Sequence, residues 1–91
     1  MKTIRLRITG RVQGVGYRAW VIETARSFGL RGWVRNRADG SVEILATGAE
    51  EVLAVLIEAC GRGPASARVS EVAIAEDREE GDVGFVARPT E

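Results

Sequence analysis

The 91-residue sequence is 45% hydrophobic and 29% charged, carries no net charge, and contains one cysteine and no histidine. This length holds a single domain over residues 1–91, and the chain is too apolar and too periodic to be disordered. The composition excludes disulfides within the chain, Cys/His zinc sites and any mechanism with a histidine base. Because no Asp/Glu cluster has calcium-loop spacing, we expect no metal and no cofactor.

The chain lacks the marks of a membrane or exported protein. No apolar run approaches the ~20 residues needed to cross a bilayer. Residues 1–7 alternate charged and apolar side chains, unlike the continuous apolar stretch of a signal peptide. We therefore expect a cytoplasmic protein without membrane contacts.

Charge is divided unevenly between the two halves. Residues 1–40 carry nine basic and two acidic side chains, a net charge of +7, and residues 41–91 carry four basic and eleven acidic ones, a net charge of −7. The two halves can interleave in the fold and neutralise each other, or the basic half can present a face that attracts an anion. The sequence leaves both interpretations open.

The N-terminal third predicts a strand, a glycine-rich loop and a helix. Apolar and polar side chains alternate over residues 4–8, which is the period of a strand with one buried face. A loop with three glycines follows at residues 10–16. Apolar residues then recur at helical spacing over residues 17–28, and Gly29 lies where a left-handed C-cap would end this helix.

The middle of the chain predicts a hairpin. A strand over residues 30–37 is followed by Asp39-Gly40, a pair for which positive φ is cheap at both positions, and by a returning strand over residues 41–46. Val42 and Ile44 are expected on one face of the returning strand, with Ser41 and Glu43 on the other.

The C-terminal half predicts a second helix and two strands. Thr47 and Glu50 have the spacing of a capping box, which predicts a helix over residues 49–60 that Gly61-Arg62-Gly63-Pro64 ends. Beyond it we expect a strand over residues 68–75, an acidic turn over 76–82 and a short strand over 85–88.

Several side chains outside the loop are expected to serve packing or solvation. Trp20 and Phe28 are predicted in the core on the apolar face of the first helix, and Cys60 is predicted to be buried. Trp33 is expected to pack on its strand neighbours rather than to line the site. Among the arginines, Arg11, Arg35 and Arg37 are expected to be surface or steering charges rather than direct ligands of an anion.

The order β-α-β-β-α-β favours the α+β class and a ferredoxin-like sandwich: an antiparallel four-stranded sheet with two helices on one face, plus a short fifth strand. A right-handed crossover would make the first two strands run in the same direction. Their C-terminal ends and the start of the first helix then share one edge of the sheet. Residues 14–18 and Asn36 should therefore converge, although 18 positions separate Arg18 from Asn36.

The loop before the first helix has the features of an anion cradle. Two glycines allow a tight turn that points amides inward, the helix N-terminus adds partial positive charge, and Arg18 can donate two N–H groups to one oxyanion. A glycine-containing turn without function would look the same, so the pattern leaves both open. The predicted phosphate-binding residues are Gln13, Gly14, Val15, Gly16, Tyr17 and Arg18.

Residues 10–18, Gly-Arg-Val-Gln-Gly-Val-Gly-Tyr-Arg, resemble the signature loop of the acylphosphatase family, and residues 32–43 resemble its second signature. Residues 63–69 and 85–86 also fit the usual ending of that family. The resemblance implies hydrolysis of the carboxyl–phosphate bond of acyl phosphates, releasing carboxylate and inorganic phosphate without a cofactor. It implies that Arg18 binds the phosphoryl group and that Asn36 orients the attacking water. Tyr17 stands where the family often has Phe.

The composition fits this chemistry. The leaving carboxylate has a parent pKa of about 4, so it needs no proton donor, whereas the alkoxide of a simple phosphomonoester would need one. An asparagine is too weak to be a general base, so we expect its amide oxygen to align the water while a phosphoryl oxygen takes the proton. The expected partner is a small acyl phosphate, acted on by a monomer.

Two rival interpretations remain. Ferredoxin-like domains also bind RNA, but the predicted strand over residues 41–46 has no aromatic residue for stacking, so we expect no nucleic-acid partner. An acylphosphatase-like module can also serve a larger carbamoyl-transfer protein, and the lack of zinc-type cysteines weighs against this.

Overall fold

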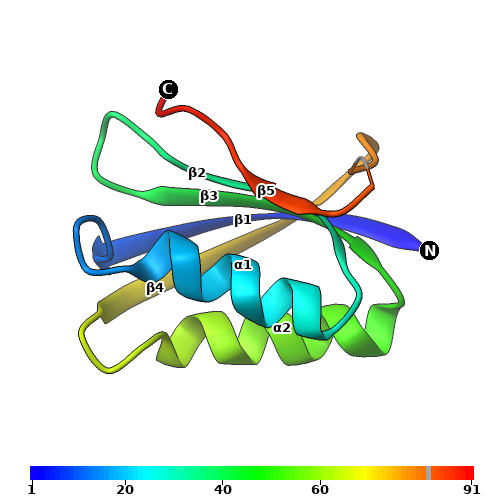
Figure 1. Ribbon diagram of the computed structural model, residues 1–91, viewed down its shortest axis with the longest axis horizontal. Helices are drawn as coiled ribbons and strands as arrows, with labels where there is room; N and C mark the ends of the chain where they lie inside the picture. Colours follow the sequence, from blue (N-terminus) through cyan, green and yellow to red (C-terminus); the bar gives the residue numbers. More distant parts are fainter. Residues whose placement is uncertain (82) are drawn as a thin grey trace.

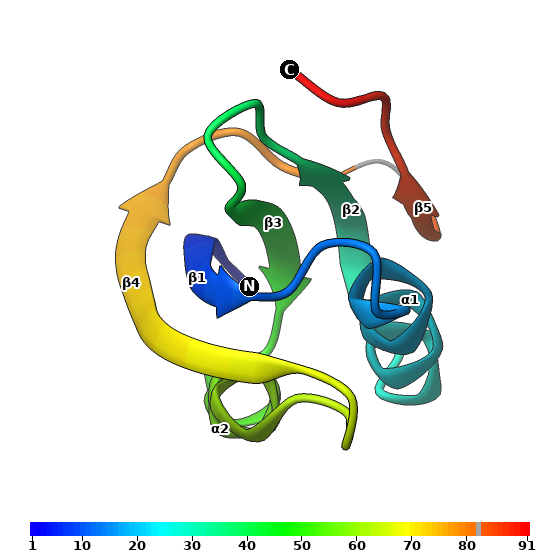
Figure 2. The same cartoon turned by 90° about the vertical axis from the view of Figure 1, so that its left-hand side faces the viewer.

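A computed structural model describes residues 1–81 and 83–91. The chain forms β1 (Lys2–Arg11), α1 (Tyr17–Ser27), β2 (Arg31–Asn36), β3 (Val42–Gly48), α2 (Glu50–Arg62), β4 (Arg68–Asp77) and β5 (Phe85–Ala87). The strand order is β4-β1-β3-β2-β5, and both helices cover one side of the curved sheet (Figures 1 and 2). The four longer strands are antiparallel and β5 pairs in parallel with β2, which confirms the ferredoxin-like sandwich.

The topology places three predicted site elements at one edge. β1 and β2 each pair antiparallel with β3, which lies between them, so β1 and β2 run in the same direction. The ends of both strands, the loop after β1 and the start of α1 therefore lie at the same end of the sandwich, on the left of Figure 1. This is the convergence that the crossover rule predicts.

The core lies between the sheet and the helices. Alternate residues of β1 and β3 point into it, and α1 and α2 each contribute one apolar stripe. Cys60 is fully buried there, as expected. The largest buried side chains of the core include Tyr17, Phe85, Leu6, Ile8, Ile44, Leu53 and Leu56.

The C-terminus of α1 has a closed cap, and it corrects one core prediction. The N–H of Gly29 donates to Arg26 O (3.0 Å) and that of Leu30 donates to Ala25 O (3.0 Å), with Gly29 at φ +70°. The chain thereby reverses and places Leu30 in the core, while Phe28 is 38% exposed. The prediction of a buried Phe28 is wrong because the turn, and not the helix, fills the core at this point. Trp20 is partly buried against the core.

The predicted capping box at the start of α2 is wrong. Thr47 belongs to β3, and its buried hydroxyl bonds that of Thr3 (2.7 Å) and accepts the N–H of Gly81 (3.0 Å). The N-cap of α2 is Ala49, which has no side-chain hydrogen bond. The reason is that the β1–β3 ladder continues to the pair Lys2–Gly48 and keeps Thr47 in the sheet.

The hairpin turn and the ends of α2 and β4 differ in detail from the sequence predictions. Only Gly40 has positive φ (+95°), whereas Asp39 keeps negative φ and its carboxylate accepts the N–H and Oγ–H of Ser41 (2.9 and 2.6 Å). α2 runs through Gly61 and ends before Gly63, at φ +65°. β4 continues to Asp77, so the expected acidic turn begins inside a strand, and Asp82 lies outside the described residues. Among the helices described, none is long and apolar enough to cross a membrane.

Candidate active site

The loop between β1 and α1 leaves a row of backbone amides open. Gly14 and Gly16 have φ of +74° and +80°, and a Cβ at either would meet nothing within 4 Å, so the backbone conformation and not crowding requires glycine. Within the described part of the chain, the N–H groups of residues 14–19 have no acceptor, and the first that does is Trp20, bonded to Gly16 O (3.1 Å). The first turn of α1 carries no acid. This helix N-terminus is therefore open to an anion.

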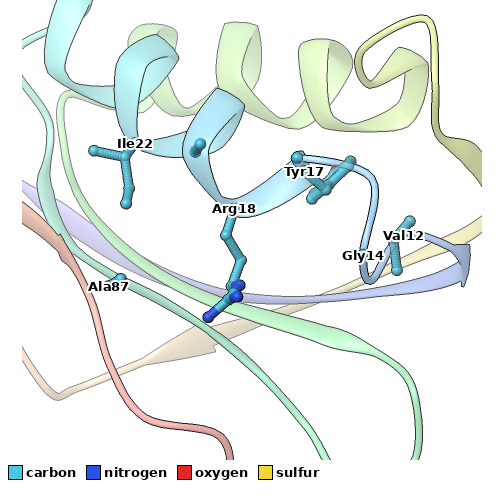
Figure 3. A pocket seen from close by; sticks show the side chains of 8 residues that line it. Val12, Gly14, Tyr17, Arg18, Ile22 and Ala87 are labelled. Carbon is cyan, nitrogen blue, oxygen red and sulfur yellow. The ribbon is translucent and has the colours of Figure 1, made fainter.

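Arg18 lies in that first turn with an exposed side chain. It makes no ion pair or side-chain hydrogen bond with any residue the structure describes. Figure 3 shows its side chain leaving α1 toward the sheet, with the loop on one side and Ile22 and Ala87 on the other. A cavity of about 330 Å³ surrounds it, lined by Val12, Gly14, Gly16, Tyr17, Arg18, Ala19, Ile22 and Ala87.

Asn36 is the last residue of β2 and lies at the same edge. It pairs with Val42 of β3, and its carbonyl accepts the N–H of Glu91 (3.2 Å). Its side-chain Oδ1 is buried and has no donor among the described residues. A buried acceptor without a donor costs about 1–3 kcal/mol, which is a reason to look for an external donor. Asn36 does not line the cavity around Arg18.

Gln13 joins the loop to the hairpin that follows Asn36. Its Nε2 donates to Arg37 O (2.8 Å) and to Ser41 O (2.9 Å). On the other side, Ser66 Oγ donates to Val15 O (2.8 Å). The contact of Gln13 has no signal in the sequence, since its partners are backbone atoms 24 and 28 positions away. The cavity residues Ala19, Ile22 and Ala87 were also not predicted, although Ile22 lies one helical turn beyond Arg18.

The two reactive side chains behind the loop are kept neutral. Burial raises the pKa of the Tyr17 phenol, whose hydroxyl donates to Cys60 O (2.8 Å). Burial also raises the pKa of the Cys60 thiol to about 11, so it is not a thiolate at neutral pH. Both residues therefore help to hold the loop in place, and neither side chain serves as a nucleophile.

The opposite face of the sheet neutralises part of the N-terminal positive charge. Glu43, 5% exposed, bonds Arg5 (2.6 Å) and Arg35 (2.8 Å) and lies 3.4 Å from Arg37. Arg5 also bonds Asp77 (2.7 Å). This supports the interpretation that the two halves of the chain neutralise each other.

Trp33 and Glu43 both contact arginine side chains on this face of the sheet. Trp33 is buried, with the guanidinium carbons of Arg35 and Arg88 at 4.7 and 4.8 Å from its ring centroid. Burial alone would raise the pKa of Glu43, but the hydrogen bonds from Arg35 and Arg5 outweigh this effect, and the pKa is lowered.

No set of three or more His, Cys, Asp or Glu able to hold a metal occurs within residues 1–81 and 83–91.

The start of α1 has no counter-charge of its own and lies at the edge of a βαββαβ sheet, beside a guanidinium without an ion-pair partner among the described residues. These features define a small α+β domain with a position open to an anion. The comparisons with known proteins are more specific. The family model described as acylphosphatase matches residues 4–87, and the chain belongs to the acylphosphatase family, hydrolases that act on acyl phosphates.

Relatives match over most of the chain. An acylphosphatase of Rhodospirillum rubrum is 48% identical over 90 residues, covering 99% of both chains. One of Rhodopseudomonas palustris (strain BisB5) is 57% identical over 75 residues, covering 81% of this chain and 76% of the relative. The crystal structure of acylphosphatase from Bacillus subtilis superimposes with a TM-score of 0.92 at 42% identity, covering 97% of this chain and 99% of that one.

The same fold occurs inside a larger protein. Full-length HypF, crystallised in a phosphate- and nucleotide-bound form, matches with a TM-score of 0.85 at 26% identity, covering 98% of this chain but 12% of that one. This chain therefore corresponds to the whole of the R. rubrum relative and to a small part of HypF.

Proposed function

We propose that this acylphosphatase holds the phosphoryl group of its substrate on the loop from Gln13 to Arg18 and orients the attacking water with Asn36. The observation that carries the assignment is the acid-free N-terminus of α1, whose free amides lie beside the guanidinium of Arg18. Backbone N–H groups and a forked guanidinium together suit an oxyanion with several oxygens. Asn36 lies at the same edge of the sheet, at the end of β2, and its side-chain amide offers an acceptor oxygen that no described residue uses.

The reaction follows from these positions. Water attacks phosphorus, the bond between phosphorus and the acyl oxygen breaks, and the carboxylate leaves with the electron pair. The proton of the water passes to a phosphoryl oxygen, so neither Asn36 nor any other side chain acts as a base. The loop and Arg18 stabilise charge on the phosphoryl oxygens, and Asn36 sets the direction of attack.

The rest of the cavity indicates where the acyl group lies. Beyond the loop and Arg18, the wall is formed by Ala19, Ile22 and Ala87. We propose that the acyl group lies against this apolar wall, on the far side of Arg18 from the loop (Figure 3). Apolar acyl groups such as benzoyl should then be favoured over charged ones.

A single copy in the cytoplasm remains our proposal for the working form. Sedimentation of the active enzyme should give the mass of a monomer, and activity per chain should not change on dilution.

The test is phosphate release from benzoyl phosphate in excess EDTA by the wild type, Arg18→Ala and Asn36→Ala. We expect turnover by the wild type and a fall of at least ~10²-fold in each folded variant, the size typical of losing a preorganised contact. Arg78→Ala, which removes an exposed arginine near the opposite end of β4, is the control and should retain wild-type activity.

Two further results bear on the mechanism. Simple phosphomonoesters should be poor substrates, since no proton donor serves the leaving alkoxide. An inactive wild type, or variants as active as the wild type, would reduce the loop to an anion-binding turn. A rate–pH profile with an essential enzyme base near neutrality would exclude the proton path given above.

A further inference from the structure

The side chain of Gln13 faces away from the phosphate cradle. Its Nε2 has two carbonyl partners, Arg37 O at 2.8 Å and Ser41 O at 2.9 Å. Carbonyl oxygens only accept, so the group that meets both must be the amide NH₂ and not the amide oxygen. Both N–H donors of Gln13 are thus in use, and its remaining Oε1 can only accept. The side chain has no donor left for a phosphoryl oxygen.

The two carbonyls belong to the base of the β2–β3 hairpin. Arg37 directly follows Asn36, and its N–H donates to Ser41 O (2.8 Å). Asn36 itself pairs with Val42, the residue after Ser41. Gln13 therefore bonds the hairpin at two points. One is the residue after Asn36, and the other is the residue before Val42, the pairing partner of Asn36.

This contact bridges the two halves of the reaction site. The amides and Arg18 come from the loop and α1, whereas Asn36 comes from the end of β2. Among the residues described, the two bonds of Gln13 are the only hydrogen bonds between residues 12–16 and the hairpin residues 37–41. The distance from the held phosphoryl group to the amide of Asn36 depends on how these two segments sit relative to each other.

We infer that Gln13 is a positioning residue: by bonding Arg37 O and Ser41 O, it sets the place of Asn36, and so of the attacking water, relative to the phosphate loop. The inference rests on the proposed function of Arg18 and Asn36. It assigns phosphate binding within residues 13–18 to the backbone amides and Arg18, and alignment of the water to the pair Gln13–Asn36. A displacement of about 1 Å between a nucleophile and its target can lower a rate by ~10²-fold.

Two substitutions remove the hydrogen bonds of Gln13 to the hairpin in different ways. Gln13→Glu is isosteric but places a carboxylate oxygen against two carbonyl oxygens, which repels the hairpin. Gln13→Met keeps a similar length and removes both donors without adding charge. Ser66→Ala is the matched control, because Ser66 also bonds the loop, at Val15 O (2.8 Å), but from the side away from the hairpin.

The experiment measures kcat and KM for benzoyl phosphate and the inhibition constant of inorganic phosphate, for each variant alone and combined with Asn36→Ala. We expect Gln13→Glu to lower kcat by roughly tenfold or more and Gln13→Met by a smaller factor. In the uncharged Gln13→Met variant the phosphate inhibition constant should stay within about twofold, because the cradle itself is unchanged. In the Asn36→Ala background the same Gln13 substitutions should change kcat less than about twofold, since nothing is left to position. Ser66→Ala should be additive with Asn36→Ala.

Three outcomes would overturn the inference. In Gln13→Met, a phosphate inhibition constant that rises in step with the loss of kcat would make Gln13 a phosphate ligand. Full additivity with Asn36→Ala would make its effect independent of the water. Wild-type kcat in folded Gln13→Met would remove its role even if Gln13→Glu did not fold. Failure of the proposed function is seen separately, as an inactive wild type or a fully active Asn36→Ala.

Discussion

The two helices of this protein begin in opposite ways. Neither N-cap, Gly16 in α1 or Ala49 in α2, makes a side-chain capping bond. α2 carries Glu50 and Glu51 in its first turn, which places negative charge on its own amides. α1 has no acid there, carries a positive charge at Arg18, and enters from a glycine at φ +80°. The helix that only supports the fold supplies its own counter-charge, and the helix at the candidate site leaves that position open for a ligand.

Arginines show the same contrast. Arg35 is largely covered and bonds Glu43 (2.8 Å) and Glu91 across the outer face of the sheet. Arg18 is exposed and has no ion-pair partner in the described part of the chain. An arginine that the fold has already neutralised stabilises it, whereas one left without a carboxylate is available to a substrate. The five predictions below run from the largest expected effect to the smallest.

The first substitution gives α1 the counter-charge that α2 already has. Ala19→Glu places a carboxylate in the first turn of α1, at a residue that lines the cavity. It should lower kcat/KM for benzoyl phosphate by ~10²-fold or more and weaken inhibition by phosphate, because the new carboxylate occupies or repels the anion site. Thermal unfolding should show no loss of stability. As the matched control, Glu51→Gln in α2 should leave activity unchanged. Retained activity in Ala19→Glu would show that the start of α1 is not the phosphate site.

The second substitution tests the arginines that the fold neutralises. Glu43→Gln leaves Arg5, Arg35 and Arg37 without their shared carboxylate and should lower the free energy of unfolding by about 3 kcal/mol. This corresponds to a factor of ~10² in the folding equilibrium. Urea unfolding measures this loss of free energy of unfolding. kcat/KM under native conditions should stay within about twofold, and a parallel loss of both would contradict the separation of the two faces.

Acid should have the same effect as this substitution. The pKa of Glu43 in the fold lies below its ordinary value of 4.5, since hydrogen bonds from Arg35 and Arg5 outweigh the opposite effect of burial. The unfolded chain therefore takes up the proton first as the pH falls, so the stabilisation is present above about pH 4.5 and is lost below it. The urea midpoint of the wild type should fall steeply below this pH, and Glu43→Gln should flatten the profile. Equal slopes would show that other carboxyls carry the acid sensitivity.

The third substitution keeps the positive charge of the open helix start but removes the guanidinium fork. Arg18→Lys should lower kcat/KM by about tenfold, less than Arg18→Ala, because an ammonium group cannot form two parallel bonds to one phosphoryl group. Stability should not change, since the side chain makes no ion pair or hydrogen bond with the described residues. Steady-state kinetics measures the effect. A Lys variant as active as the wild type would mean that charge alone is needed.

The smallest expected effect concerns the apolar wall beyond Arg18. Ile22→Ala should lower kcat/KM for benzoyl phosphate by roughly fivefold, since it removes apolar contact with the acyl group. Acetyl phosphate, whose acyl group is too short to reach this wall, should be hydrolysed as by the wild type. An equal loss on both substrates would place the acyl group elsewhere.

Local patterns predicted the parts of the site that depend on near neighbours. The start of α1 at Tyr17, the left-handed Gly29 and the strand character of residues 4–8 follow from periodicity and glycine placement over a few residues. The handedness of the crossover then predicted that Asn36 lies at the edge where α1 begins. The predicted capping box at Thr47 and the buried Phe28 were wrong because sheet pairing and a chain reversal override local preference.

The sequence by itself thus determined the order of elements, the family and the residues that we propose to carry the chemistry, because each is encoded in short motifs with fixed spacing. The tertiary structure alone decided which arginines are neutralised, since Glu43 meets Arg5 only through the pairing of strands far apart in the chain. It also decided what Gln13 contacts, because its acceptors are backbone carbonyls that any residue would present. Motifs encode which groups are present, and packing between distant segments determines which of them remain free for a ligand.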